Sequence, residues 1–160
     1  HLGMKILYSL VNAREDAWCE RVFAPWVDME QVLRENNIPL YALESGDALT
    51  EFDLIGFTLQ YELSYTNMLN MLDLAGIPLK SADRTALSPL VVAGGPCVCN
   101  AEPIADFVDI FFLGEGEKVD LEVIDLYKEH KKRVFTDSFL CYLLSINFVS
   151  STGSTILPSL

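Results

Sequence analysis

The chain has 160 residues, of which 51% are hydrophobic, and its formal net charge is -12 from 23 acidic and 11 basic residues. This length and hydrophobic content indicate one globular domain with a sizeable core rather than a disordered segment. The acidic balance argues against nucleic-acid or anionic-membrane binding, because both need clustered Lys and Arg.

The first half of the chain alternates between short apolar runs and helical patterns. A helix is predicted over 28–37, where Asp28 and Gln31 have the spacing of a capping box and Asn36–Asn37 end the pattern. The run at 53–60 is apolar enough for a strand that is covered on both faces. From the residues alone, further strands are predicted over 4–11, 19–25 and 39–43.

The second half repeats this alternation. A helix is predicted over 64–76, with a stripe of apolar residues that we interpret as core-facing and with Gly76 as its stop. The stripe consists of Met68, Leu69, Met71, Leu72 and Ala75. Strands at 90–93 and 109–113, a helical turn near 104–107 and a helix over 118–133 complete the pattern.

Strands separated by helices of ten to fifteen residues are typical of βαβ units. We therefore predict a three-layer α/β domain of the Rossmann or flavodoxin-like class with a mostly parallel sheet. The strands expected in that sheet are 21–23, 54–58, 90–93 and 109–113. In such sheets, ligands bind at the carboxyl ends of the strands.

Two of these strands run directly into glycine turns at that edge. Each turn alone is typical of an ordinary tight connection, but the matching position of the two favours a binding edge. No G-x-G-x-x-G or G-x4-G-K-[ST] motif is present, which argues against the classical dinucleotide and phosphate-loop sites. A side chain at Gly95 or Gly114 is expected to collide with a ligand while leaving the sheet mostly intact. The predicted cofactor-binding residues are Thr58, Gln60, Gly94, Gly95, Pro96, Gly114, Glu115 and Gly116.

The four cysteines, Cys19, Cys97, Cys99 and Cys141, match neither a zinc pattern nor the C-x3-C-x2-C spacing of an iron–sulfur site. We predict four free thiols and no bound metal. With only two histidines the chain has no Ser/His/Asp set, and no catalytic residue is predicted. No apolar run has the length of a membrane span and no signal-peptide pattern opens the chain, so a cytoplasmic protein is predicted.

Several long strings resemble a known family. FDLIGFTLQYELSYTNMLNMLDLAGIPL (52–79), PLVVAGGPC (89–97) and GEGE (114–117) are similar to the N-terminal cobalamin-binding-type domain that precedes the radical SAM barrel in a bacterial radical SAM protein family. HLGMKILYSLVNAREDAWCERVFAPWVDMEQVLRE (1–35) fits the same family. The resemblance covers 1–132, so 133–160 is expected to be a divergent tail or the start of a linker to the barrel.

The resemblance implies that the family's first strand lies upstream of His1 and that 4–11 belongs to the first helix instead of a strand; we follow it on this point. It also implies cobalamin at the glycine turns, with the corrin ring over Gly94–Pro96 and the nucleotide tail toward Gly114–Gly116. The chain lacks the D-x-H-x-x-G motif whose histidine ligates cobalt, although members of this type often bind cobalamin without one. The 4Fe–4S cluster and S-adenosylmethionine would belong to a downstream barrel on the same longer chain.

Three functions stay open at this point. The chain is a cobalamin-binding accessory domain of a radical SAM enzyme, a degenerate Rossmann-like module without cofactor, or an independent domain that binds a small molecule such as a nucleotide. In each case no catalysis is expected from this fragment alone.

Overall fold

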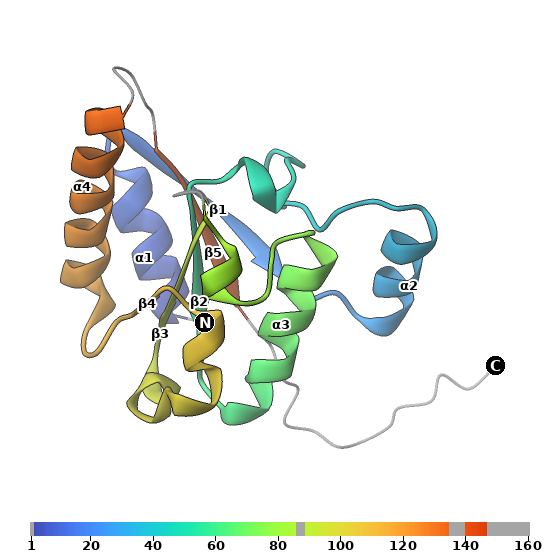
Figure 1. Ribbon diagram of the computed structural model, residues 1–160. Coiled ribbons are helices and arrows are strands. Elements are labelled where there is room, and N and C mark those ends of the chain that lie inside the picture. The colour runs from blue at the N-terminus through green and yellow to red at the C-terminus, as the bar shows by residue number, and fades with distance from the viewer. Residues whose placement is uncertain (1, 86–88, 135–139, 147–160) are drawn as a thin grey trace.

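The computed structural model describes residues 2–85, 89–134 and 140–146, which form a three-layer α/β domain (Figure 1). The sheet has the order β1-β5-β2-β3-β4, and each neighbouring pair of strands is parallel. The predicted fold class is confirmed. The strands are β1 (Ala17–Phe23), β2 (Leu54–Thr58), β3 (Leu90–Gly94), β4 (Ile110–Phe111) and β5 (Leu140–Ile146). The α-helices are α1 (Leu2–Asn12), α2 (Val27–Glu35), α3 (Tyr65–Leu74) and α4 (Gly116–Val134).

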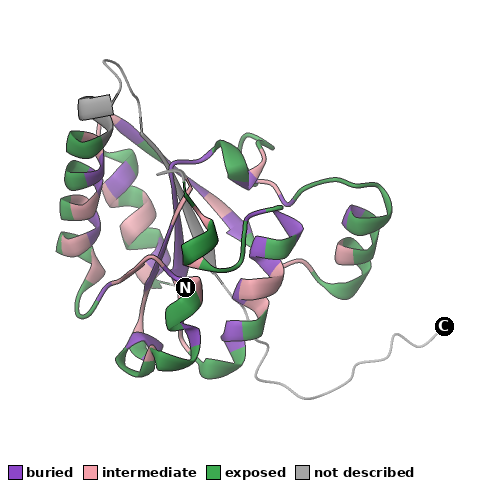
Figure 2. Ribbon diagram, viewed as in Figure 1, coloured by how far each residue is buried: buried purple, intermediate pink, exposed green. Residues whose placement is uncertain are grey.

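Helices cover both faces of the sheet, with α1 and α4 on one side and α2 and α3 on the other (Figure 1). Successive side chains of a strand point to opposite faces. In β2, accordingly, Leu54 packs with Met4 and Ile124 beneath α1 and α4, while Ile55 packs with Met68 beneath α3. Buried residues lie on the described strands and also on the helices and connections that pack against them (Figure 2).

All four strands expected in the sheet are present, but the strand predicted at 39–43 is wrong. Only Tyr41 pairs, in an isolated antiparallel bridge to Ala48. Leu40 N–H donates instead to the carbonyl of Leu74, 3.0 Å away. The apolar pattern that suggested a strand reflects the burial of Leu40 and Ala42 against the core.

The opening segment is helix α1, as the resemblance implies, and the strand suggested by its residues alone is wrong. Met4 and Val11 are buried seven residues apart, which is two helical turns. The capping box of the next helix is also wrong. The α2 cap is Trp26, without a side-chain hydrogen bond, and Gln31 bonds to Glu35 at 2.7 Å. A glutamate one turn away offers Gln31 a direct partner.

Strand β5, the second in the sheet order, falls within 133–160, the range that the sequence analysis separated as a tail. It pairs with β1 from Ala17↔Leu140 to Phe23↔Ile146, and with β2 on its other side. The sheet therefore continues into that range. In the flavodoxin-like order 2-1-3-4-5 the second position belongs to the first strand of the chain. Here the last of the described strands occupies it.

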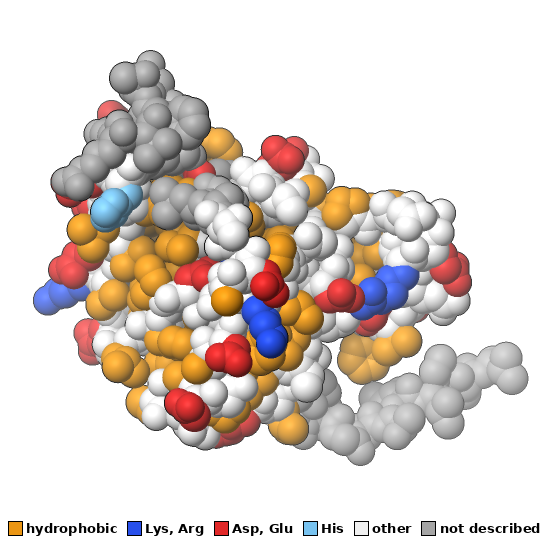
Figure 3. Space-filling model, in the orientation of Figure 1, with side chains coloured by type: hydrophobic (Ala, Val, Ile, Leu, Met, Phe, Trp, Pro, Cys, Tyr) orange, Lys and Arg blue, Asp and Glu red, His pale blue; other side chains and the backbone are white. Residues whose placement is uncertain are grey.

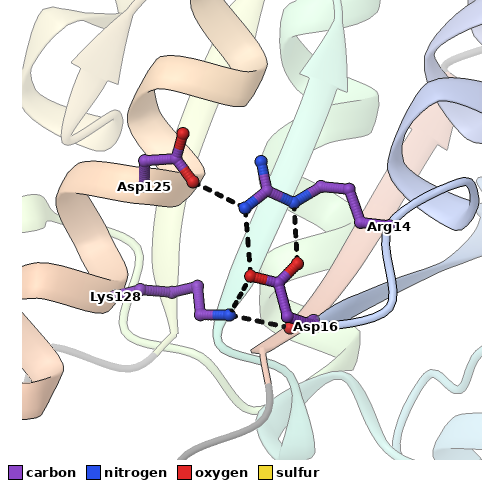
Figure 4. A network of polar contacts seen from close by, with 4 residues as sticks. All are labelled: Arg14, Asp16, Asp125 and Lys128. Carbon is purple, nitrogen blue, oxygen red and sulfur yellow. Dashed lines mark hydrogen bonds and ion pairs between the residues drawn. The ribbon is translucent and has the colours of Figure 1, made fainter.

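Ion pairs join the turn before β1 to α4 (Figure 4). Arg14 contacts Asp16 at 2.9 Å and Asp125 at 2.6 Å, and Lys128 also pairs with Asp16. Hydrogen bonds from Arg14 and then Lys128 hold the pKa of the Asp16 carboxyl well below its usual range. This network ties α4 to the amino end of the sheet.

The visible surface in Figure 3 carries scattered acidic side chains and few basic ones, in line with the net charge of -12. None of the helices in the described part of the chain has the length and hydropathy needed to cross a membrane.

A second polar cluster holds the starts of β3 and β4. The guanidinium of Arg84, whose side chain is 3% exposed, pairs with both carboxylate oxygens of Asp109 at 3.1 and 3.2 Å. It also donates to the carbonyls of Pro78, Leu79 and Phe107. Asp109 in turn accepts the Val91 N–H at 2.7 Å. The Arg84 side chain thus donates hydrogen bonds to carbonyl groups in the connections before β3 and before β4, and to the Asp109 carboxylate.

Replacing Arg84 should therefore destabilise the folded chain. We expect Arg84→Met to lower the free energy of unfolding by about 3 kcal/mol, because it leaves a carboxylate and three carbonyls without their donor. Urea titration measures this loss. Arg34→Met is the control, since Arg34 also bridges two acidic side chains but is largely exposed, and a much smaller loss is expected there. Equal losses in the two variants would contradict the assignment.

Candidate functional site

A cavity of about 160 Å³ opens at the carboxyl edge of the sheet, beneath the first turns of α1 and α4. Helix α1 contributes Gly3 and Leu7, and α4 contributes Gly116, Glu117 and Asp120. The strands and the loops that follow them supply the rest of the lining: Gly56, Phe57, Thr58, Gln60, Val92, Gly94, Gly95, Phe112 and Gly114.

The cavity exists because side chains are missing where they would fill it. Gly56 and Gly94 alternate with residues of the α2/α3 core, so both face the α1/α4 layer. Across from them, Gly3 and Gly116 lie in the first turns of the two helices. Four positions without Cβ atoms therefore meet and leave a hollow between sheet and helices.

The structure brings most of the predicted site residues together at this cavity. Pro96 and Glu115 are exposed and do not line it. A role in cofactor binding stays a prediction for all eight. Those that line the cavity are Thr58, Gln60, Gly94, Gly95, Gly114 and Gly116.

A side chain at Gly95 was expected to meet a ligand, but it would also collide with the chain itself. A Cβ built there would lie 2.6 Å from the carbonyl oxygen of Leu59, and the backbone has φ +101°. Leu59 N–H donates to the Gly94 carbonyl at 2.8 Å, so the loops after β2 and β3 are in direct contact. Gly95 is therefore required by the packing of the chain itself, and substituting it would disturb the edge with or without a ligand.

The other turn behaves differently. Gly114 also has positive φ, +112°, but a Cβ there would meet nothing within 4 Å. At Gly94 the nearest contact of a Cβ would be Phe112 at 3.7 Å, which is ordinary van der Waals distance. A side chain at either of these glycines, unlike one at Gly95, would not collide with the chain, and the space at Gly114 is open to a ligand.

Asp120 is a site residue that the sequence analysis missed. It is 4% exposed and lines the cavity, and no other side chain or backbone group of the described residues forms a hydrogen bond or ion pair with its carboxyl. Burial, and secondarily the charge of Glu117, raises the pKa of Asp120 to about 7. Helical spacing is the signal that could have found it, because Asp120 shares the inward face of α4 with Ile124 and Tyr127.

This carboxyl makes stability depend on pH. The pKa of Asp120 is about 7 in the folded chain, against about 4 when unfolded. Between these values the folded state keeps a proton that the unfolded state loses, so this contribution to stability falls as pH rises from 4 to 7 and then levels off. The difference between the folded and unfolded pKa values corresponds to a loss of about 4 kcal/mol.

We expect Asp120→Asn to remove this loss. In urea titrations from pH 4.5 to 8, the stability of the variant should rise relative to the wild type as pH increases, and the difference should be largest near pH 8. Glu122→Gln, an exposed change on the same helix, should leave the wild-type pH profile in place. Parallel profiles of wild type and Asp120→Asn would contradict the burial assigned to this carboxyl.

Three cysteines can be placed. Cys19 and Cys97 are buried, Cys99 is exposed, and all three are free thiols. Burial raises the pKa of the Cys97 thiol. Within the described part of the chain no group of three or more His, Cys, Asp or Glu residues is arranged to hold a metal. The side chain of Cys141 lies outside that part.

Comparison with known proteins places this chain in a family. The model of the family described as radical SAM proteins, N-terminal, matches residues 3–149, and the chain belongs to this family. An uncharacterized protein of Methanocaldococcus jannaschii is 40% identical over 95 residues, which cover 58% of this chain and 20% of that protein. The chain thus spans about a fifth of the curated relative that it matches. No solved structure matches.

Proposed function

We propose that this chain is a ligand-binding accessory domain of a radical SAM protein and that its ligand is a cobalamin-type cofactor at the carboxyl edge of the sheet. The observation that carries the proposal is the cavity, where residues following three different strands meet helices α1 and α4. The family match adds the context, since the family is defined as the N-terminal part of radical SAM proteins.

The cavity is too small to hold the whole of such a ligand. Pockets for drug-sized ligands have volumes of roughly 300–1,000 Å³, and this cavity has about 160 Å³. A corrin ring would therefore lie outside, across the open rim at Gly94 and Gly114, and only the part of its nucleotide tail beyond the phosphate would enter. Thr58 and Gln60 would offer polar contacts at the rim, and Leu7 and Phe112 apolar walls further in.

Cobalamin supplies a redox-active cobalt when it is bound. The described residues offer this cobalt no histidine at the rim. His130 lies fourteen positions beyond the start of α4, which is about 21 Å along the helix axis. The domain would thus hold the cofactor through its corrin ring and tail, and the chain's own residues would bind it, orient it and exclude water.

The absence of a rim histidine from the described residues also favours the second candidate, a cofactor-free module that packs beside a radical SAM domain of the same polypeptide. Both candidates place this chain next to that domain, and only the first requires ligand binding. A binding measurement therefore separates them.

The test is to measure hydroxocobalamin binding by the 160-residue chain, using equilibrium dialysis and the corrin absorption bands. We expect wild type to bind and Gly114→Ala to bind at least tenfold more weakly, because a methyl group would project from the open rim where the ring approaches. No binding by wild type would leave the cofactor-free module as the better description.

Gly46→Ala is the matched control. Gly46 also has positive φ, +79°, and open space around a Cβ, but it lies far from the cavity lining. Both substitutions should cost about 1–2 kcal/mol of backbone strain, so only a contact at the rim would separate their affinities. Gly94→Ala, which adds a methyl group without that strain, should weaken binding as well. Equal affinities in all three variants would argue against a ligand on this rim.

A further inference from the structure

The most unusual polar group in the described part of the molecule is the carboxyl of Asp120. Other buried carboxylates have partners: Glu20 accepts hydrogen bonds from Trp18 and Ser45, and Asp53 accepts one from the Tyr127 hydroxyl. Asp120 is equally buried, lines the cavity and has no such partner among the described residues. Its Oδ2 lies 3.5 Å from the place where a Cβ on Gly116 would stand, at the cavity wall.

A buried polar group without a partner is unfavourable, and a ligand that donates hydrogen bonds would relieve it. Among the described residues the lining contains no Lys, Arg or His, and Glu117 adds a second acidic group. A phosphate or carboxylate on the ligand would be repelled at this place. An ammonium group would bring three donors and a full charge into a cavity with few acceptors. Paired hydroxyl groups match the two oxygens of one carboxylate without adding charge.

The walls beside the carboxyl are apolar. Leu7, Val92 and Phe112 surround the space above Gly56, which suits the C–H faces of a small ring. In dinucleotide-binding folds a carboxylate binds the ribose hydroxyls in the same way, also at the carboxyl edge of a parallel sheet. The cavity volume of about 160 Å³ suits a single sugar ring, with an attached base at the open rim.

We propose that this cavity binds the ribose of a nucleoside or nucleoside-like group, whose hydroxyls donate hydrogen bonds to Asp120. The inference rests on the proposed function for the location of the site and deepens it by naming the group that enters. It does not require the ligand to be cobalamin.

The affinity for such a ligand should depend on the ionisation of Asp120. Hydroxyl donors need the carboxylate form, and the pKa of Asp120 is about 7. Of the described charged groups packed around it, Glu117 on α4 acts on this carboxyl, while the described lining residues of α1 and of the strands have no titratable side chain. Binding should therefore strengthen as pH rises from 5.5 to 8.

Adenosine is the probe, because it presents both ribose hydroxyls without a phosphate. Titration of the 160-residue chain, followed by NMR of the Asp side-chain carboxyl carbons, should show binding with a dissociation constant of about 1 mM or lower at pH 8. Affinity should fall about tenfold or more at pH 5.5, where Asp120 is mostly protonated. 2′,3′-Dideoxyadenosine should bind about tenfold or more weakly than adenosine at pH 8, because both donors are gone.

Asp120→Asn keeps the shape and removes the negative charge, so it should weaken adenosine binding and abolish its dependence on pH. Glu117→Gln should keep the preference for adenosine over the dideoxy compound. No adenosine binding up to about 10 mM, or equal binding of the two nucleosides, would overturn the inference. Hydroxocobalamin bound without any response to adenosine would overturn this inference alone, while adenosine bound without cobalamin would overturn only the choice of cofactor.

Discussion

The parallel direction of all five strands is the constraint on which the rest of the structure depends. It requires helices on both faces, and it brings every strand's carboxyl end to one edge. The alternation of side chains then divides the core in two, one part beneath α1 and α4 and one beneath α2 and α3. Gly56 and Gly94 are set by this alternation onto the α1/α4 side, so the floor of the cavity follows from register and direction, and the loops after the strands complete its lining.

Sequence patterns were sufficient for the elements whose apolar spacing is long and regular. The helices at 64–76 and 118–133 could be predicted from helical spacing over several turns, and the strands at 54–58 and 90–93 from short, continuous apolar runs. The run at 39–43 misled because burial in an irregular segment produces the same short alternation as a strand. Too many of residues 4–11 are apolar for the periodicity of a helix or of a strand to be recognised, and only the resemblance indicated a helix.

The site was predictable in part for the same reason. Glycines after buried strands mark a place where the chain turns, and parallel topology brings such places together. The sequence alone did not indicate why glycine is needed at each of these positions. Gly95 is needed because Leu59 lies against it, whereas a Cβ at Gly94 would make only an ordinary contact and one at Gly114 would meet nothing. Asp120 escaped notice because an acidic residue in a helix is normally on the solvent side, and its neighbours Val119 and Leu121 concealed the inward register.

Two features at this edge lower the stability of the chain, and they coincide. A hollow left by Gly3, Gly56, Gly94 and Gly116 forgoes packing, and a buried carboxyl beside it carries a desolvation penalty. A leucine at position 120 would fill the hollow and remove the penalty at once. Elsewhere in the described core, local pattern, packing and polar satisfaction agree, as at Arg84 and Asp109. Departures from such agreement are expected where a protein binds something. The edge between α1 and α4 is therefore where the physical argument for a ligand is strongest, independent of which ligand it is.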